Sequence, residues 1–336
     1  MLQQTGFFVL AFMFTAYVLL DGYDLGIAAV APFVATTRGE RGALMRAIGP
    51  FWNGNEVWLI AAGASLFGLY PEAYAVAFSG FYLPFIVALW LLMFRGIAIE
   101  LRESIDNDLW HTLWDALFTL SSAALTIVFG VALGNLVRGV DLRHGNYFLG
   151  TFGALLNPFA LGVGILALAA LGLHGVVYAA MRIEEPFATR CIAVAQRLWY
   201  AVLAIFVAVT GAAFAIDHGA DVRPVLSGII TLLGFAALIA VRGSLRSPRR
   251  AFLASSCFLT TLMAAAAATL FPYLVPNYPR GTGGLSIYDA GPSSTAALAT
   301  MTTVIVVALV ALLAYRTIVA VRMTRPIRID DEGGYG

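Results

Sequence analysis

The sequence predicts an all-α polytopic membrane protein, and composition is the first observation behind this prediction. Of the 336 residues, 60% are hydrophobic and 12% are charged, whereas soluble domains average about 25% charged residues. The second observation is that apolar runs of roughly 18 residues or more recur along the whole chain, which is the length a helix needs to cross a bilayer. These runs lack the period-two alternation of a membrane β-barrel, so helices are the expected elements.

Apolar runs bounded by charged residues, Pro or Gly predict nine transmembrane helices in a single integral membrane domain, 1–336. The predicted spans are residues 6–33, 50–69, 74–95, 112–137, 152–180, 196–216, 222–241, 250–272 and 294–321. No basic segment precedes the first run, so we expect a membrane span there rather than a cleaved signal peptide. The segment 272–293 is rich in Pro and Gly and is expected to form a structured loop, whereas the tail 325–336 is expected to be disordered.

Arginine predicts the orientation, since all 20 basic residues are arginines. Sixteen of them lie in alternate connections and at the C-terminal end: Arg38, Arg41, Arg46, Arg95, Arg102, Arg182, Arg190, Arg197, Arg242, Arg246, Arg249, Arg250, Arg316, Arg322, Arg325 and Arg328. The other connections hold only Arg138, Arg143, Arg223 and Arg280. Because positive residues accumulate on the cytoplasmic side, the C-terminus is expected in the cytoplasm and the N-terminus outside. The net charge of +1 gives no indication of a nucleic-acid partner.

Acidic residues inside the predicted spans are the first candidates for function. Asp21 and Asp24 share one face of the first span, and Asn53 and Glu56 share one face of the second. At about 1.5 Å per residue, Asp24 lies roughly 14 Å and Glu56 roughly 10 Å from the cytoplasmic ends of these antiparallel helices. We therefore expect the acids to meet inside the protein, with Arg95 of the third span as their counter-ion.

Two interpretations of this group stay open. Several carboxylates in a low-dielectric interior cannot all remain ionised, so at least one is expected to hold a proton near neutral pH, as a proton relay requires. Alternatively, the acids pair with Arg95 or bond backbone groups near Gly22 and Gly26, with a purely structural role. We expect Trp52 and Trp58 to serve packing or interfacial anchoring, and Asn55 to bond a neighbouring helix.

Metal and haem chemistry have little support in the sequence. His111, His144 and His218 fall at span ends or in loops, so only His174 lies within a span, where two facing histidines would be needed to hold a haem. His174 is a weak metal candidate and is expected to be a hydrogen-bonded packing residue. Cys191 and Cys257 form no metal motif. No haem and no metal are therefore expected in this chain.

Six sequence blocks resemble one known family. They read "LLDGYDLGIA", "IGPFWNGNEVWLIAAGASLF", "AFSGFYLPFIVALWLLMFRGIAIE", "VALGNLVRG", "LLNPFALGVG" and "LFPYLVP…LSIYDAGPSS", in this order along nearly the whole chain. The chain resembles subunit II of cytochrome bd-type quinol oxidases, and the block from Gly49 to Gly63 is the most distinctive part of the resemblance.

The resemblance implies a two-subunit terminal oxidase of the bacterial cytoplasmic (inner) membrane, which passes electrons from quinol to dioxygen, makes water and generates a membrane potential. Subunit I would carry haems b and d and the quinol site. Subunit II would have two four-helix bundles plus a peripheral helix, support subunit I and contribute to a proton route and an oxygen route. A structural quinone, lipid and a small single-span accessory subunit are further possible partners.

The resemblance also assigns residues, with one departure. Asp21 and Asp24 match the acidic pair of the family's first span, and Trp58 matches a tryptophan near its oxygen path. Many members have a carboxylate where this chain has Asn53. Glu56, one helical turn away, could take over the proton-transfer role of that carboxylate. Otherwise protons enter chiefly through the partner.

Two other functions are compatible with intramembrane acids. A proton-coupled secondary transporter is the alternative from another class, although the halves of the chain show no repeat and no matching helix breaks of the kind many transporters have. An assembly factor without a proton path is a third. The sequence leaves open whether the donor is ubiquinol or menaquinol, and through which subunit oxygen enters.

Overall fold

A computed structural model describes residues 1–143, 147–216, 224–292, 294–322 and 326–329. The predictions that concern Arg223, Arg325, His144, His218 and the first residues of the 222–241 span lie outside these ranges. The helices are α1 Leu2–Val34, α2 Arg38–Ile48, α3 Trp52–Leu69, α4 Pro71–Gly80, α5 Tyr82–Leu101, α6 Asp108–Arg138, α7 Phe152–Leu155, α8 Pro158–Arg182, α9 Phe187–Ala215, α10 Pro224–Ser244, α11 Pro248–Leu270 and α12 Thr295–Arg322. The strands are β1 Leu142–Arg143, β2 Tyr147–Phe148, β3 Tyr273–Pro276 and β4 Gly284–Ser286.

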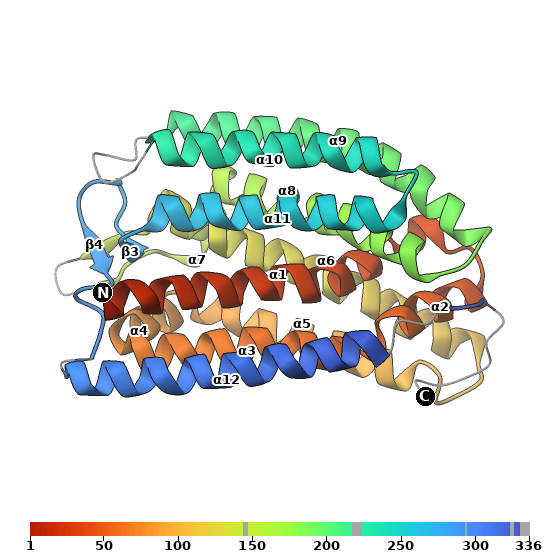
Figure 1. Ribbon diagram of the computed structural model, residues 1–336, viewed down its shortest axis with the longest axis horizontal. Coiled ribbons are helices and arrows are strands. Elements are labelled where there is room, and N and C mark those ends of the chain that lie inside the picture. Colours follow the sequence, from red (N-terminus) through yellow and green to blue (C-terminus); the bar gives the residue numbers. More distant parts are fainter. Residues whose placement is uncertain (144–146, 217–223, 293, 323–325, 330–336) are drawn as a thin grey trace.

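The all-α membrane fold is confirmed. Among the described residues, eight helices are long and apolar enough to cross a membrane, namely α1, α5, α6 and α8 to α12. Helix α3 fills the place of the remaining predicted span, but Asn53, Asn55 and Glu56 in its first turns make it less apolar than the others. It nevertheless packs along α1 and α12 over its length (Figure 1).

The long helices form two groups of four. Helices α1, α3, α5 and α6 make the first bundle, and α8, α9, α10 and α11 make the second (Figure 1). The bundles meet where α8 packs against α1 and α6, and α12 lies outside them against α1 and α3. This arrangement agrees with the two four-helix bundles and peripheral helix that the resemblance implies.

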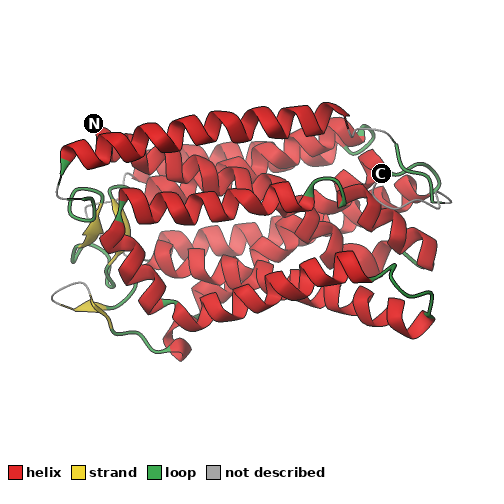
Figure 2. Ribbon diagram, turned by 90° about the horizontal axis from the view of Figure 1, so that it is seen from below, coloured by secondary structure: helices red, strands yellow, loops and turns green. Residues whose placement is uncertain are grey.

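The two ends of the molecule differ in structure. The strands gather at the end that holds the N-terminus (Figure 2). There β3 and β4 pair antiparallel, and the segment after β3 bonds Val140, so the predicted structured loop over 272–293 is present in its described part. Helix α2 and the α10–α11 turn lie at the opposite end, near the C-terminus (Figure 1).

Prolines explain where the predicted span boundaries are wrong. The single span 74–95 is two helices, α4 and α5, because Pro84 lacks an N–H and its ring would clash with the carbonyl of Gly80 in a continuous helix. The second helix then continues to Leu101. In the same way Pro158 begins α8 and leaves α7 as a separate turn. Helix α9 begins after Pro186, well before predicted residue 196.

Two segments at the arginine-rich end were not expected to be ordered elements. Helix α2 begins with a capping box, in which Thr37 accepts from the Glu40 N–H and Glu40 accepts from the Thr37 N–H. The expected disorder of the tail is wrong for residues 326–329. Ile327 exchanges backbone hydrogen bonds with the strand-like segment after α8, and Arg46 donates to the carbonyls of Arg328 and Ile329.

Glycines allow α1 and α8 to cross in close contact. A Cβ atom on Gly26 would lie 1.9 Å from the carbonyl oxygen of Leu171, and one on Gly175 would lie 2.3 Å from the backbone nitrogen of Ile27. Small residues at such crossings let membrane helices approach closely. The crossing fixes the position of α1, which carries both predicted aspartates, against the second bundle.

We expect Gly26→Ala to destabilise the protein by about 1–3 kcal/mol or more, because the new methyl meets backbone that cannot move aside. The measurement is the thermal unfolding midpoint of the detergent-solubilised complex. Gly63→Ala in α3 is the matched control, since a Cβ atom there meets nothing within 4 Å. Equal stability of the two variants would contradict the close crossing.

Candidate functional site

The guanidinium of Arg95 is the centre of a buried polar network. Its Nη1 donates to Asp21 Oδ2 at 2.8 Å and to Glu56 Oε1 at 3.2 Å, while Nη2 donates to Asp21 Oδ1. Nη2 also lies 3.8 Å from Asp24 Oδ2. The side chains of Arg95, Asp21 and Asp24 are 0% exposed. Carboxylates from α1 and α3 therefore converge on one cation of α5.

A second set of hydrogen bonds extends this network to α12. The Asn55 amide donates to Asp24 Oδ2 at 2.7 Å, to the Tyr23 hydroxyl at 2.9 Å and to the Leu20 carbonyl at 3.0 Å. Arg316 Nη2 donates to the same Tyr23 hydroxyl at 2.7 Å. Asn55 thus bonds a neighbouring helix, as expected. Arg316 is a member that the sequence reasoning missed, because it was counted only as an end charge.

Several atoms of the network have hydrogen-bonding capacity left. Among the described residues, Asp24 Oδ1, Asn55 Oδ1 and Arg95 Nε are buried without a partner. A buried polar atom left unsatisfied costs about 1–3 kcal/mol. Three carboxyl groups also lie within ion-pair distance of Arg95, and Arg316 joins the network through the Tyr23 hydroxyl, so the acidic groups outnumber the cations by one. Such a site can accept a proton, because its acidic groups outnumber its cations and some of its hydrogen-bond acceptors have no partner.

A shallow surface cavity of about 590 Å³ lies between α3 and α5 and borders this network at Glu56. Its lining includes Trp52, Asn53, Glu56, Gly96 and Glu100. The Glu56 side chain is 21% exposed and contacts Arg95 on its other side, so it joins the cavity to the buried group. Asn53 and Glu100 are exposed.

The predicted site residues therefore divide into two places. The structure brings Asp21, Asp24, Glu56 and Arg95 together and leaves Asn53 on the cavity wall. Glu100 was missed because the third span was predicted to end at residue 95. The continued apolar periodicity of "RGIAIEL" was the signal that could have placed it on a helix.

The two candidate tryptophans are both packed. Trp58 is fully buried in a cluster with Met13, Tyr17 and Ala62, with its ring centroid 6.1 Å from that of Phe12. Trp52 is 9% exposed and lines the cavity beside Gly96. These contacts fit the packing interpretation, and a role beside an oxygen path stays a prediction.

His174 is held by hydrogen bonds at both ring nitrogens. Nδ1 lies 2.7 Å from Ser255 Oγ, Nε2 lies 3.1 Å from the Leu19 carbonyl, and the ring stacks on Phe252 with centroids 4.7 Å apart. No nitrogen is left for iron. Within the described ranges no group of three or more His, Cys, Asp or Glu side chains could hold a metal ion. His174 therefore does not fit as a haem ligand.

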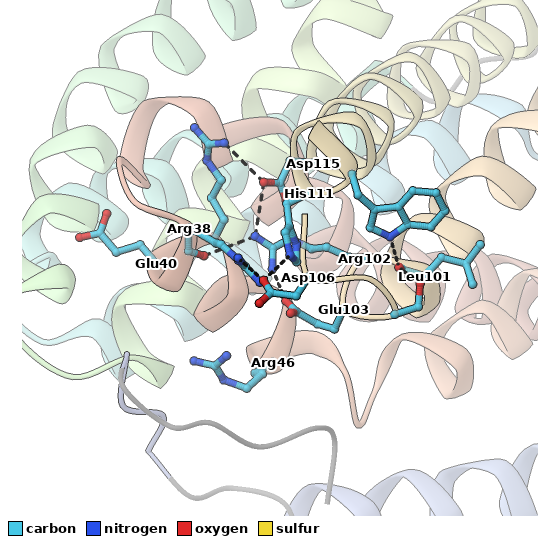
Figure 3. Close-up of polar contacts among 12 residues, drawn as sticks. Arg38, Glu40, Arg46, Leu101, Arg102, Glu103, Asp106, His111 and Asp115 are labelled. Atoms are coloured by element: carbon cyan, nitrogen blue, oxygen red, sulfur yellow. Dashed lines mark hydrogen bonds and ion pairs between the residues drawn. The ribbon is translucent and has the colours of Figure 1, made fainter. Parts of the chain in front are cut away.

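A second ionic cluster fixes the arginine-rich end of α5 (Figure 3). Asp115 of α6 accepts from Arg102 Nε at 2.6 Å and from Arg41 Nη1 at 3.4 Å. Arg38 pairs with Asp106 at 2.7 Å, and this contact and charge hold the pKa of Asp106 below its usual range. The cluster ties α2 and the α5–α6 connection to the last turn of α5, next to Glu100.

Glu40 links α2 to α9 at the same end. Burial opposes ionisation of its carboxyl group, but hydrogen bonds from Arg190 and from the Thr36 and Thr37 backbone outweigh burial and lower its pKa. The charged form of Glu40 therefore stabilises the fold.

Fold and network together define a class: a polytopic helical-bundle protein that keeps paired ionisable groups inside the bilayer. The chain belongs to the family of cytochrome bd terminal oxidase subunit II, whose profile matches residues 2–323. It is 30% identical over 329 residues to the probable cytochrome oxidase subunit 2 of Haemophilus influenzae, an alignment that covers 88% of this chain and 87% of the relative.

Two further comparisons agree. The chain is 29% identical over 322 residues to the cytochrome bd-I ubiquinol oxidase subunit 2 of Escherichia coli K12, covering 85% and 84% of the two chains. A solved structure of bd oxidase from Geobacillus thermodenitrificans shares the fold with a TM-score of 0.77 and 18% identity, covering 94% of this chain and 97% of that one. The resemblance is confirmed: this is subunit II of a bd-type oxidase, a multi-pass protein of the bacterial cytoplasmic membrane. Membership argues against the secondary-transporter alternative.

We expect Arg95→Met to destabilise the subunit by about 3–5 kcal/mol, because it leaves Asp21 buried without its cation. The double variant Asp21→Leu/Arg95→Met should lose less than the sum of the two single changes, since the residues act as a pair. The unfolding midpoint in detergent measures both effects. Arg38→Gln is the control at an exposed ion pair and should change the midpoint little. Additive losses would contradict the pairing.

The lowered pKa of Glu40 predicts a pH dependence. Stability from a carboxyl group with a lowered folded-state pKa is fully present above its unfolded value of about 4.3 and is lost as pH falls through the folded value. Wild type should therefore exceed Glu40→Gln in unfolding midpoint by a constant amount between about pH 5 and 8. The difference should close at lower pH. Arg190→Gln should reproduce the loss, and a difference that widens on acidification would contradict the assignment.

Proposed function

We propose that this subunit binds no haem, performs no quinol chemistry itself, and supports a haem-bearing subunit I in a complex that oxidises quinol and reduces dioxygen to water. The support is the family membership, the E. coli relative described as a ubiquinol oxidase subunit, and the hydrogen bonds that occupy both ring nitrogens of His174. The structural quinone and the small accessory subunit stay predictions of the resemblance.

The face formed by α3, α5 and α12 is our proposed contact surface for subunit I. Large apolar side chains are exposed along it, including Ile60, Trp90, Met93 and Val307. Glu56 and Glu100 reach the cavity on the same face. Carboxylates at this level cannot face hydrocarbon without a large desolvation cost, so a protein partner rather than lipid is the occupant that fits.

We further propose that the cavity leads protons from the cytoplasm to the buried network. The arginine-rich end is taken as cytoplasmic by the positive-inside rule. Of the two carboxylates that line the cavity, Glu100 lies in the last turn of α5 at that end, and Glu56 contacts Arg95. Asn53 between them can hydrogen-bond to water but cannot exchange a proton at neutral pH. The proton carriers are therefore Glu100 and Glu56, and the Asp21–Asp24 pair receives the proton.

One observation carries this route: Glu56 is the network carboxylate that is both partly exposed and bonded to Arg95. Asp21 and Asp24 are closed off from the cavity. A purely structural ion pair would not need a carboxylate at this boundary, where it makes only a single 3.2 Å contact with the arginine.

Glu56→Gln should lower the turnover per haem by about ten-fold or more, because the amide removes a proton-transfer group while preserving shape. The complex is captured through this chain, its haem content is read from the reduced spectrum, and oxygen consumption is measured with quinol. Glu103→Gln, an exposed carboxylate at the same end, is the matched control and should leave turnover unchanged.

Two results would contradict the proposal at separate points. If activity of Glu56→Gln falls only in proportion to haem content, Glu56 is structural and the route fails. If capture of wild-type chain brings down no haem-bearing protein with b- and d-type bands, the assignment of the partner fails.

A further inference from the structure

Five arginines at one end of the second bundle have no carboxylate partner among the described residues. They are Arg197 of α9, Arg242 of α10, Arg246 of the α10–α11 turn, and Arg249 and Arg250 of α11. None of them is within ion-pair distance of an acid. The sequence contains no Asp or Glu at all in residues 186–216 or 222–288. No acid of the described part of the chain therefore neutralises this basic patch.

Aromatic side chains place part of this patch at one point on the surface. Trp199 Nε1 donates to the Leu238 carbonyl at 2.7 Å and joins α9 to α10. The Arg242 guanidinium lies 5.9 Å from the centroid of the neighbouring Tyr200 ring, which is 58% exposed. Arg197 is three residues before Tyr200 and so shares its helix face. Trp and Tyr are typical of the membrane–water boundary.

The first turn of α11 adds a further positive electrostatic potential to this basic patch. Pro248 is its first residue, the N-cap Ser247 makes no side-chain cap hydrogen bond, and Arg249 and Arg250 follow directly. The N-terminus of a helix carries partial positive charge and free N–H groups, so arginines there oppose the helix dipole unless an anion is present. Helix α2 differs, because Thr37 and Glu40 cap its N-terminus.

We propose that this basic patch, Arg197, Arg242, Arg246, Arg249 and Arg250, binds the phosphate headgroup of an anionic phospholipid. Charge complementarity and the position beside the exposed ring of Tyr200 identify the occupant. Its acyl chains lie along apolar side chains exposed on the same helices, among them Val207, Ile239 and Leu253. Basic pockets between membrane helices are known to hold such headgroups.

This proposal goes beyond orientation by the positive-inside rule. Arginines that only orient the chain would interact with any anionic surface and hold no lipid after delipidation. A site predicts retention of defined lipid molecules that depends on these side chains, and it is independent of the proton route proposed for the first bundle.

The test uses the purified two-subunit complex, delipidated in detergent and titrated with phosphatidylglycerol, phosphatidylcholine or inorganic phosphate. Retained lipid is counted by native mass spectrometry, and the unfolding midpoint is followed in parallel. We expect phosphatidylglycerol to bind and stabilise far better than the other two probes. Each arginine near an anionic headgroup contributes roughly five-fold in affinity, so Arg249→Gln/Arg250→Gln should weaken retention by about 25-fold at low salt.

Charge-preserving and charge-removing variants separate the site from a folding defect. Arg249→Lys/Arg250→Lys should keep most of the binding, and Arg38→Gln, which removes one positive charge at the same end outside the patch, should keep all of it. Equal effects of phosphatidylglycerol and phosphatidylcholine on wild type would overturn the proposal. Phosphate stabilising as well as the lipid, or undiminished retention in the Gln variant, would overturn it too. If the Gln variant does not fold, the wild-type comparison and the Lys variant decide the question.

Discussion

The buried pairing of Arg95 with Asp21 is the interaction on which the rest of this subunit depends. A guanidinium that is 0% exposed has lost its hydration, and only well-placed acceptors offset that cost. Asp21 supplies two of them from α1 and Glu56 supplies one from α3. The pair is weak evidence for stability in itself, because an apolar replacement of both partners is often neutral. The pair instead fixes the helix arrangement, because acceptors from α1 and α3 meet the Arg95 guanidinium of α5 in one relative register of the three helices.

Helix α1 carries this constraint and a second one on the same few residues. In "YVLLDGYDLG", Asp21 and Asp24 face α3 and α5, while Gly22 and Gly26 face α8 closely enough that a side chain would meet Leu171. Tyr23 lies between these positions, stacks on Tyr178 of α8 and accepts hydrogen bonds from Asn55 and Arg316. One stretch of sequence therefore both joins the two bundles and positions the acids.

The sequence predicted the features that depend on local patterns, and it did not predict the features that depend on tertiary contacts. Apolar runs placed the membrane helices, and equal depth from one end brought Asp21, Asp24 and Glu56 to one level, which matches their shared contact with Arg95. Depth and helix face alone could not separate Asn53 from Glu56, because residues three apart lie on the same face of a helix. Only tertiary packing shows that Glu56 is the one that contacts Arg95 of α5. Arg316 escaped prediction for a similar reason: a long side chain near a helix end more often extends to water, and its inward direction depends on Tyr23. The order in residues 326–329 rests on hydrogen bonds with Arg182, Glu184 and Arg46, which no local pattern predicts.

The distribution of arginines gives the two bundles different chemical characters. In the first bundle and its loops, Arg38, Arg41, Arg95 and Arg102 each contact a carboxylate. In the second bundle, Arg190 of α9 pairs with Glu40, but the five arginines of the basic patch have no carboxylate partner among the described residues. In the roles proposed above, the first bundle holds the acids of the proton route and the second presents its arginines to the membrane surface.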